Sequence, residues 1–198
     1  MKRLALSITC TALLGLTLTA CGDSGSDTPA SAGSAPAASS GSSSAASKRA
    51  AFPKGDAGAK SLMEALRAAD GPETVKTLQP TAADYAAVFT DDLAGKAESF
   101  YKTKLWNGQK VDMGVSAAQT DLKVFQATSE DIRKWTKAVE RDFPGGYKQL
   151  GPHLKPGLTV YRWKYTEPGE DSGRAYEGLV YVNDHWIWVP KAWEILEQ

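Results

Sequence analysis

Residues 174–189, RAYEGLVYVNDHWIWV, decide the fold of this chain. They form two runs of β-branched and aromatic side chains on either side of Asn183-Asp184. Asn and Asp both tolerate the positive φ angles of a two-residue hairpin loop. Such a loop fixes the register of the two strands, because Tyr181 then lies directly opposite Trp186. We therefore expect an antiparallel hairpin in this part of the chain.

The predicted register leaves the hairpin with two apolar faces, because directly opposed residues share a face of the sheet. One face carries Leu179, Tyr181, Trp186 and Trp188; the other carries Gly178, Val180, Val182, Ile187 and Val189. In the neighbouring strand, predicted at 158–166, Tyr161, Trp163 and Tyr165 alternate with Val160, Arg162 and Lys164. Helices easily cover only one face, so the other would need a ligand, a partner subunit or a covering segment.

This reasoning gives five candidate residues for binding a ligand or a partner: Tyr181, Trp186, Trp188, Arg162 and Lys164. The alternative is that the curled sheet and the tail 191–198 bury both faces, which would make Trp186 or Trp188 part of the core. A dimer interface on the same face is the third interpretation.

The segments before the hairpin are mainly helical by their apolar spacing. Helices are expected near 59–69, from Pro72 to residue 78, after a capping box of Thr81 and Asp84, after Thr90, and at 132–143. Strands are expected near 111–115 and 122–127, before the strands at 158–166, 174–182 and 185–189. This order predicts an α+β fold: N-terminal helices and one inserted helix packed on a curved, mainly antiparallel sheet.

The start of the chain has the features of a secretory signal peptide. Lys2 and Arg3 precede an apolar run that closes on Leu18-Thr19-Ala20-Cys21. These last four residues resemble the lipobox of bacterial lipoproteins. The resemblance implies diacylglycerol on the Cys21 thiol, cleavage after Ala20 and a further acyl chain, such as palmitate, on the new amino terminus.

The expected organisation is therefore a signal peptide at 1–20, a lipidated Cys21 with a disordered tether at 21–51, and one α+β domain at 52–198. The tether is nearly all Ser, Ala, Gly and Pro, which cannot bury enough apolar surface to order itself. We expect the protein in a bacterial cell envelope, at the outer membrane if there is one and otherwise at the outer face of the cytoplasmic membrane.

Charge and cysteine content exclude several classes of function. The chain has 23 basic and 23 acidic residues, and loss of residues 1–20 removes only Lys2 and Arg3 from this balance. Such a balance gives no electrostatic footprint for nucleic acid, so the acyl chains are the expected contact with the membrane. The two cysteines are Cys10 and Cys21, which leaves the mature chain no free thiol. We expect no metal and no cofactor.

No motif in the sequence selects a catalytic residue. His153 lies in a Gly-Pro-His loop, and His185 follows a turn, where a solvated edge residue is common. The element order resembles the cone-shaped superfamily of nuclear transport factor two and ketosteroid isomerase. Isomerases of that superfamily use an internal Asp or Tyr with an acid partner. Tyr85, Asp84, Tyr101, Tyr147 and Tyr176 could take such roles, and no pattern distinguishes them.

Three functions remain open at this point. The first is a lipid-anchored, non-catalytic domain that binds a small apolar or glycan-like ligand or another envelope protein. The second is a small envelope isomerase or hydrolase, which a buried acid beside a Tyr would favour. The third is a homodimeric scaffold.

We predict that Cys21→Ser abolishes lipidation, because the thiol is the acylated atom. Intact-mass measurement of protein extracted from membranes should show acyl chains on Cys21 in the wild type and none in the variant. Ser24→Ala, three residues into the tether, is the matched control and should remain acylated. A wild-type chain with an unmodified Cys21 would contradict the lipoprotein assignment.

Overall fold

The computed structural model describes residues 52–198. The signal peptide, Cys21 and the tether predicted above lie outside the described residues. The elements, in chain order, are helices α2 (Asp56–Leu66), α3 (Gly71–Thr77), α4 (Ala82–Val88) and α5 (Asp91–Lys104), strand β1 (Asp121–Thr128), helices α6 (Ser129–Lys134), α7 (Lys137–Asp142) and α8 (Gly146–Leu150), 3-10 helix η1 (Gly151–His153), strands β2 (Thr159–Thr166), β3 (Gly173–Val182) and β4 (His185–Trp188), and 3-10 helix η2 (Ala192–Glu197).

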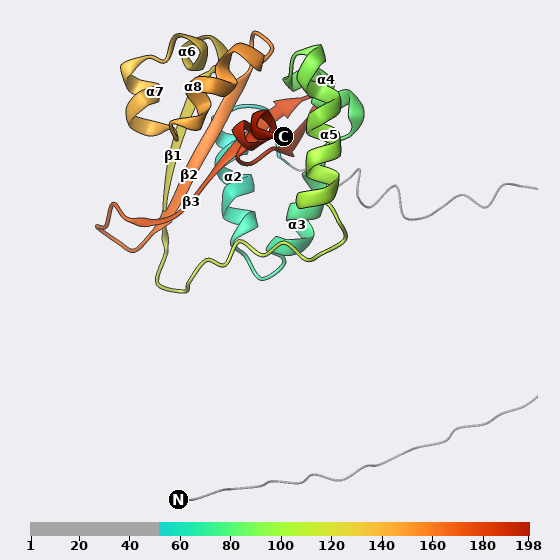
Figure 1. Ribbon diagram of the computed structural model, residues 1–198. Coiled ribbons are helices and arrows are strands. Elements are labelled where there is room, and N and C mark those ends of the chain that lie inside the picture. Colours follow the sequence, from blue (N-terminus) through green and yellow to red (C-terminus); the bar gives the residue numbers. More distant parts are fainter. Residues whose placement is uncertain (1–51) are drawn as a thin grey trace, which may run out of the picture. The chain divides into compact units, whose positions relative to one another are not determined.

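The four strands form one open antiparallel sheet in the order β1-β2-β3-β4 (Figure 1). The predicted α+β fold is confirmed. The hairpin register is confirmed as well: Tyr181 pairs with Trp186 and Leu179 with Trp188. Asn183 and Asp184 form the loop with φ angles of 47° and 61°. The local turn chemistry therefore determined the register of this hairpin.

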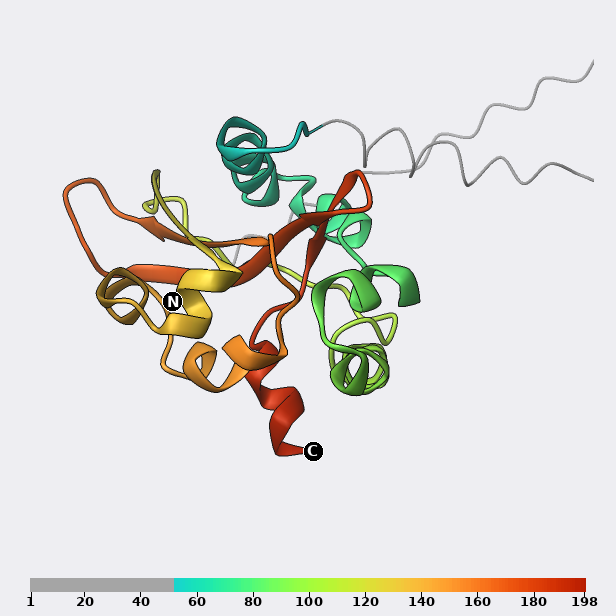
Figure 2. The same ribbon diagram turned by 90° about the horizontal axis from the view of Figure 1, so that it is seen from above.

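Helices cover both faces of the sheet, as the view from above shows (Figure 2). On one face α2 and α3 pack over a cluster rich in aromatic residues. Its members from the sheet are Tyr161, Trp163, Tyr165, Leu179, Trp186 and Trp188. On the other face the helices α4 to α8 and η2 pack over the aliphatic residues of the strands. The buried residues that β2, β3 and β4 contribute to this second cluster are Val160, Val180, Val182 and Ile187. The domain therefore has two apolar layers with the sheet between them.

A glycine changes the alternation of β3. Gly178 lies at a bulge, where the pairing of β2 with β3 shifts between Tyr161 and Arg162. Its φ of 85° favours glycine, and a Cβ there would lie 2.2 Å from the main-chain oxygen of Val189. Simple alternation would place Glu177 on the face of Leu179. The extra residue reverses this, and Glu177 pairs with Arg162 beneath η2 and α8.

The predicted helix at 132–143 is wrong in one respect, because it is broken into α6 and α7. Trp135 adopts the left-handed conformation with a φ of 49°, which ends α6. The Thr136 hydroxyl then accepts a hydrogen bond from the Val139 amide and caps α7. With α8, three short helices occupy the place of the single inserted helix that we expected.

The predicted strand at 111–115 is also wrong. Its apolar residues alternate, but Gly114 has a φ of 57° and no strand forms. Side chains from β3 bind the main chain of residues 113–114, where we had expected the hydrogen bonds of a strand. Tyr176 donates to the Met113 oxygen, and Arg174 donates to the Gly114 oxygen at 3.0 Å. Met113 thereby joins the cluster under α2.

We predict that Trp186→Ala and Trp188→Ala each lower the free energy of unfolding by about 3–5 kcal/mol through lost burial and a cavity. The two side chains are only 2% and 5% exposed. Val124→Ala is the control: Val124 is 36% exposed on β1, and its change should stay within about 0.5 kcal/mol. Thermal and urea unfolding of the Trp variants and of the Val124 control measure these changes. Unchanged unfolding of the Trp variants would contradict the core assignment.

Candidate functional site

The five residues that the sequence singled out do not form one site. Trp186 and Trp188 lie under α2, with their indole nitrogens donating to the main-chain oxygens of Phe52 and Glu177 at 3.0 and 2.9 Å. Tyr181 is partly buried at the rim and packs edge-on against Trp186. These indoles are not open to a ligand or a second subunit, because helices cover the face that we expected to be bare.

Arg162 and Lys164 lie on the opposite face. Both approach the ring of Phe125, with the Arg162 guanidinium carbon at 5.3 Å from its centre and the Lys164 ammonium at 6.0 Å. The Arg162 Nε is buried and makes no hydrogen bond with the described residues. The pair therefore belongs to a polar region under the short helices and not to the aromatic face.

A buried acid lies beside Arg162. Glu177 is 8% exposed, and its Oε1 accepts a hydrogen bond from the Lys191 amide at 3.2 Å. Burial raises the pKa of Glu177, and the Lys191 amide and the positive charge of Arg162 offset only part of that effect. No ion pair joins Glu177 to any of the described residues within 4.0 Å. The cost of burying a negative charge on Glu177 is therefore only partly offset by its neighbours.

Two buried tyrosines complete this group of residues, which we call the Glu177 cluster: Tyr101, Tyr147, Arg162 and Glu177. Burial raises the pKa of both phenols, and the negative charge of Glu177 adds to the effect. The Tyr101 hydroxyl donates to the Pro190 oxygen at 2.7 Å. The Tyr147 hydroxyl makes no hydrogen bond among the residues the structure describes. An acid beside a Tyr is the arrangement that would favour an enzyme.

A second acid is buried at the start of α4. Asp84 is 1% exposed and closes the predicted capping box with Thr81. Its carboxylate also accepts from the Asn183 amide at 2.8 Å and faces His185 Nε2 at 3.1 Å. His185 Nδ1 lies 2.8 Å from the Asn183 oxygen, so both ring nitrogens face oxygen atoms. His185 is therefore bound to the hairpin loop and α4, and is not the solvated residue that we expected.

The hydrogen bonds to Asp84 outweigh the cost of its burial. Burial alone would raise its pKa, but the bonds from Thr81 and Asn183 and the charge of His185 hold the pKa below its usual range. This network ties α4 to the hairpin loop. The Thr81 hydroxyl of this network is occupied by the capping box, so the geometry indicates a structural role.

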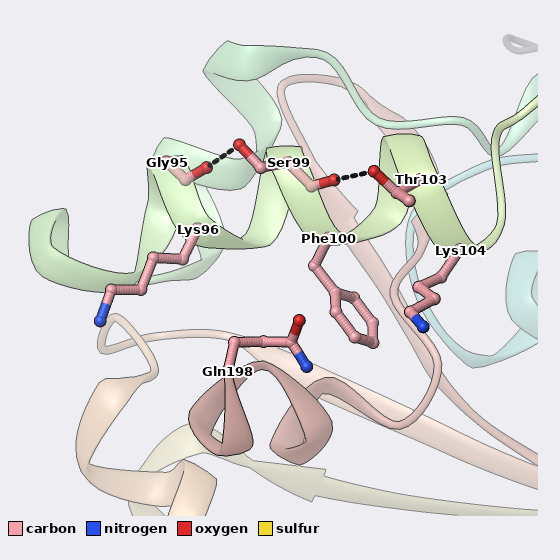
Figure 3. A pocket seen from close by; sticks show the side chains of 7 residues that line it. All are labelled: Gly95, Lys96, Ser99, Phe100, Thr103, Lys104 and Gln198. Carbon is pink, nitrogen blue, oxygen red and sulfur yellow. Dashed lines mark hydrogen bonds between the residues drawn. The ribbon is translucent and has the colours of Figure 1, made fainter.

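A groove lies between α5 and the end of the chain (Figure 3). It has a volume of about 420 Å³ and is lined by Gly95, Lys96, Ser99, Phe100, Thr103, Lys104 and Gln198. Phe100 forms an apolar floor between the two lysines, which lie two helical turns apart, about 12 Å along the axis. The hydroxyls of Ser99 and Thr103 donate to helix carbonyls, which leaves their oxygens as acceptors.

Neither lysine of this groove has an anionic partner in the described part of the chain. Lys96 and Lys104 form no ion pair within 4.0 Å among residues 52–198, whereas Lys76, Lys123, Lys155 and Lys191 do. Two further grooves are described. One lies beside Trp106 and α3 and the other beside Arg67 and residues 115–120. Arg67 forms an ion pair with Glu64 and donates a hydrogen bond to the Thr120 oxygen. Its guanidinium would have to give up these partners to bind an anionic ligand.

Residues 52–198 contain neither a metal-ligand cluster nor a membrane-spanning helix. No three His, Cys, Asp or Glu side chains there could hold a metal ion together. No helix in the same range is both long and apolar enough to cross a membrane.

Comparison with known proteins finds no matching family model, no matching curated protein and no matching solved structure. The resemblance to the cone-shaped superfamily therefore stays a prediction, and the function has to be argued from the side chains alone.

We predict that Asp84 stabilises the fold above its unfolded pKa, near 3.8, and that this contribution is lost as the pH falls through its lower folded pKa. Asp84→Asn should cost about 1–3 kcal/mol at pH 7, since it removes the charged acceptor from its donors, and less at pH 2, which lies below the unfolded pKa. Asp91→Asn, whose carboxylate is exposed and paired with Lys155, is the control and should cost at most about 1 kcal/mol. Urea unfolding across this pH range distinguishes the two, and an equal loss at both pH values would contradict the assignment.

Proposed function

We propose that this chain is a lipid-anchored cell-envelope protein whose globular domain is a non-catalytic binding module. The anchor is supported by the sequence Leu18-Thr19-Ala20-Cys21. The groove between α5 and Gln198 supports the binding role. One observation carries it: two lysines that form no ion pair within residues 52–198 flank a partly buried aromatic ring.

The chemistry of the groove favours an acidic oligosaccharide as the ligand. Phe100 offers a flat apolar face to a sugar ring, and the Lys96 and Lys104 ammonium groups offer donors to carboxylates. The oxygens of Ser99, Thr103 and Gln198 can accept hydrogen bonds from sugar hydroxyls. A groove that combines an apolar floor with a few polar groups has the usual composition of a small-ligand site.

A small envelope isomerase or hydrolase is the second candidate, favoured by Glu177 beside Tyr147. The residues that line the three described grooves do not include Glu177 or Tyr147. The enzyme needs a route for substrate to this cluster, whereas six of the seven residues that line the groove beside α5 are exposed. The binding module is therefore the better-supported function.

We predict that oligogalacturonate, a uniformly carboxylated sugar chain, binds the domain and shifts the NMR signals of α5 and Gln198, while neutral maltohexaose does not. Lys96→Gln with Lys104→Gln should weaken binding about five- to tenfold, because two exposed charge pairs contribute roughly 1–1.4 kcal/mol together. Raising the salt concentration should weaken it further.

Lys102→Gln is the matched control, since Lys102 is exposed on α5 but does not line the groove. It should bind like the wild type. Equal weakening by the control and by the double variant would indicate a diffuse charge effect and contradict this site. Signals that shift with an acidic peptide alone would favour an envelope protein as the partner.

A further inference from the structure

The two edges of the sheet are closed to different extents. At one edge β4 has only four residues, and the Trp188 amide donates outwards to the Leu78 oxygen at 3.0 Å. Asp84 binds Asn183 and His185 at the turn that precedes β4. The end of α3 and the start of α4 therefore cover this edge, which is a usual protection of an edge strand.

The opposite edge is β1, which has eight residues and lies at the left of the sheet in Figure 1. Directly after β1, the Ser129 amide donates to the Leu158 oxygen in the same register, so the odd-numbered residues of β1 exchange their hydrogen bonds with β2. The even-numbered residues Leu122, Val124 and Gln126 consequently direct their main-chain N–H and C=O groups outwards. Within residues 52–198 no hydrogen bond reaches these outward groups.

β1 lacks the features that usually keep an edge strand from pairing. It contains no proline or glycine, and the bulge of the sheet lies between β2 and β3. Its one lysine, Lys123, is bonded to the Glu170 oxygen and the Asp171 carboxylate in the loop between β2 and β3. Val124, with 36% exposure, is the one large apolar side chain of the described range that is exposed. Another strand can therefore add to this edge.

The chemistry of the edge limits how a second copy can pair with it. A two-fold axis makes the interface self-complementary, and the outward groups require even-numbered residues opposite even-numbered residues. An axis at Lys123 would oppose two like charges and would use the Thr120 oxygen, which already accepts from Arg67. An axis at Phe125 would use the oxygen of Thr128, the N-cap of α6. An axis nearer either end leaves fewer of the outward groups paired.

An axis at Val124 avoids these conflicts. Val124 then lies opposite its own copy and Leu122 lies opposite Gln126, so the outward groups form three pairs that can each exchange two hydrogen bonds. On the other face of the strand Lys123 lies opposite Phe125, and no two like charges meet. The mature chain has nearly balanced charge, so two copies repel each other little. The exposed Val124 side chains of the two copies become buried against each other.

We propose that β1 is an interface for a second copy of this chain, in which two β1 strands pair antiparallel about an axis at Val124 and join the two sheets into one. The contact is one strand from each copy, about 25 Å long, and is smaller than a standard interface of roughly 1,600 Å². We therefore expect a weak dimer. The proposed acyl anchor would hold copies on one surface and raise their effective concentration, but the pairing rests neither on the anchor nor on the groove beside α5.

Amide hydrogen exchange of the full mature chain, measured at rising protein concentration, tests whether β1 pairs. The amides of Leu122, Val124 and Gln126 should exchange about twofold more slowly when half of the chains have paired. The amide of Phe125 already donates to β2 and should not change. This contrast between outward and inward amides distinguishes strand pairing from association through another surface.

A charge at the axis should weaken the dimer. Val124→Lys places two ammonium groups opposite each other, and we expect the dissociation constant to rise about fivefold. Ala118→Lys adds the same charge on the exposed loop before β1 and should associate like the wild type. Both constants come from the concentration dependence of the exchange rates.

Disulfide cross-linking tests the register. Val124→Cys should give a linked dimer under mild oxidation, because directly opposed Cα atoms about 5.5 Å apart are within the range of a disulfide. Leu122→Cys and Gln126→Cys should each stay unlinked alone, since each lies about 13 Å along the strand from its own copy, and should link when mixed. The wild type, whose cysteines are Cys10 and Cys21, is the background control.

Exchange of the outward amides that does not depend on protein concentration would overturn the proposal. Linkage of Leu122→Cys alone in preference to the mixture would overturn the axis at Val124. Equal weakening by Val124→Lys and Ala118→Lys would show a general effect of charge and would overturn the interface. Val124→Lys should bind oligogalacturonate like the wild type, so failure of the groove and failure of the interface are separate results.

Discussion

The β3–β4 hairpin has no polar face, and the arrangement of the whole domain depends on this. Leu179, Trp186 and Trp188 face one side, while Val180 and Ile187 face the other. Each large apolar side chain left in water costs about 1.5–3 kcal/mol. Exposing either face would therefore forfeit an amount comparable with the whole net stability of a domain, about 5–15 kcal/mol. The α2–α3 pair on one side and the later helices on the other are both required, and neither layer is an accessory.

Gly178 determines that a charged residue, Glu177, lies on the face of the sheet that carries Val160 and Val180. Its bulge moves Glu177 from the side of the tryptophans to the side of Arg162, where the main-chain amide of Lys191 can reach it. Any side chain at Gly178 would collide with the Val189 oxygen, so the position is tied to the turn that leads into η2. One backbone irregularity thus brings together the buried acid, the strand that carries Arg162 and the segment that closes the domain.

The sequence could predict features that depend on local chemistry, and it failed where distant contacts decide. Asn183-Asp184 set the hairpin register, and Thr81 with Asp84 formed the expected capping box. The helix break at Trp135 was missed because apolar spacing continues across it, although Thr136 is a cap signal. Glu177 was missed because strict alternation would place it on the face of Leu179, and the bulge at Gly178 is decided by contacts that are distant in the sequence. The spacing of Lys96, Phe100 and Lys104 is readable as one stripe of α5, but only the fold shows that the two lysines have no ion-pair partner among residues 52–198.

The Glu177 cluster and the groove lie on two sides of the same short segment, residues 190–198, which bears on the choice between enzyme and binding module. Tyr147 is enclosed by Phe143 and Trp193 at ring distances of 5.3 Å, and Gly146 leaves no space beside the indole. Trp193 therefore closes this side of Tyr147, the phenol whose pKa the charge of Glu177 helps to raise. An enzyme would therefore need η2 to open for every turnover, while the binding module needs only the position of Gln198. The close packing around Tyr147 therefore weighs against the enzyme and in favour of the binding module.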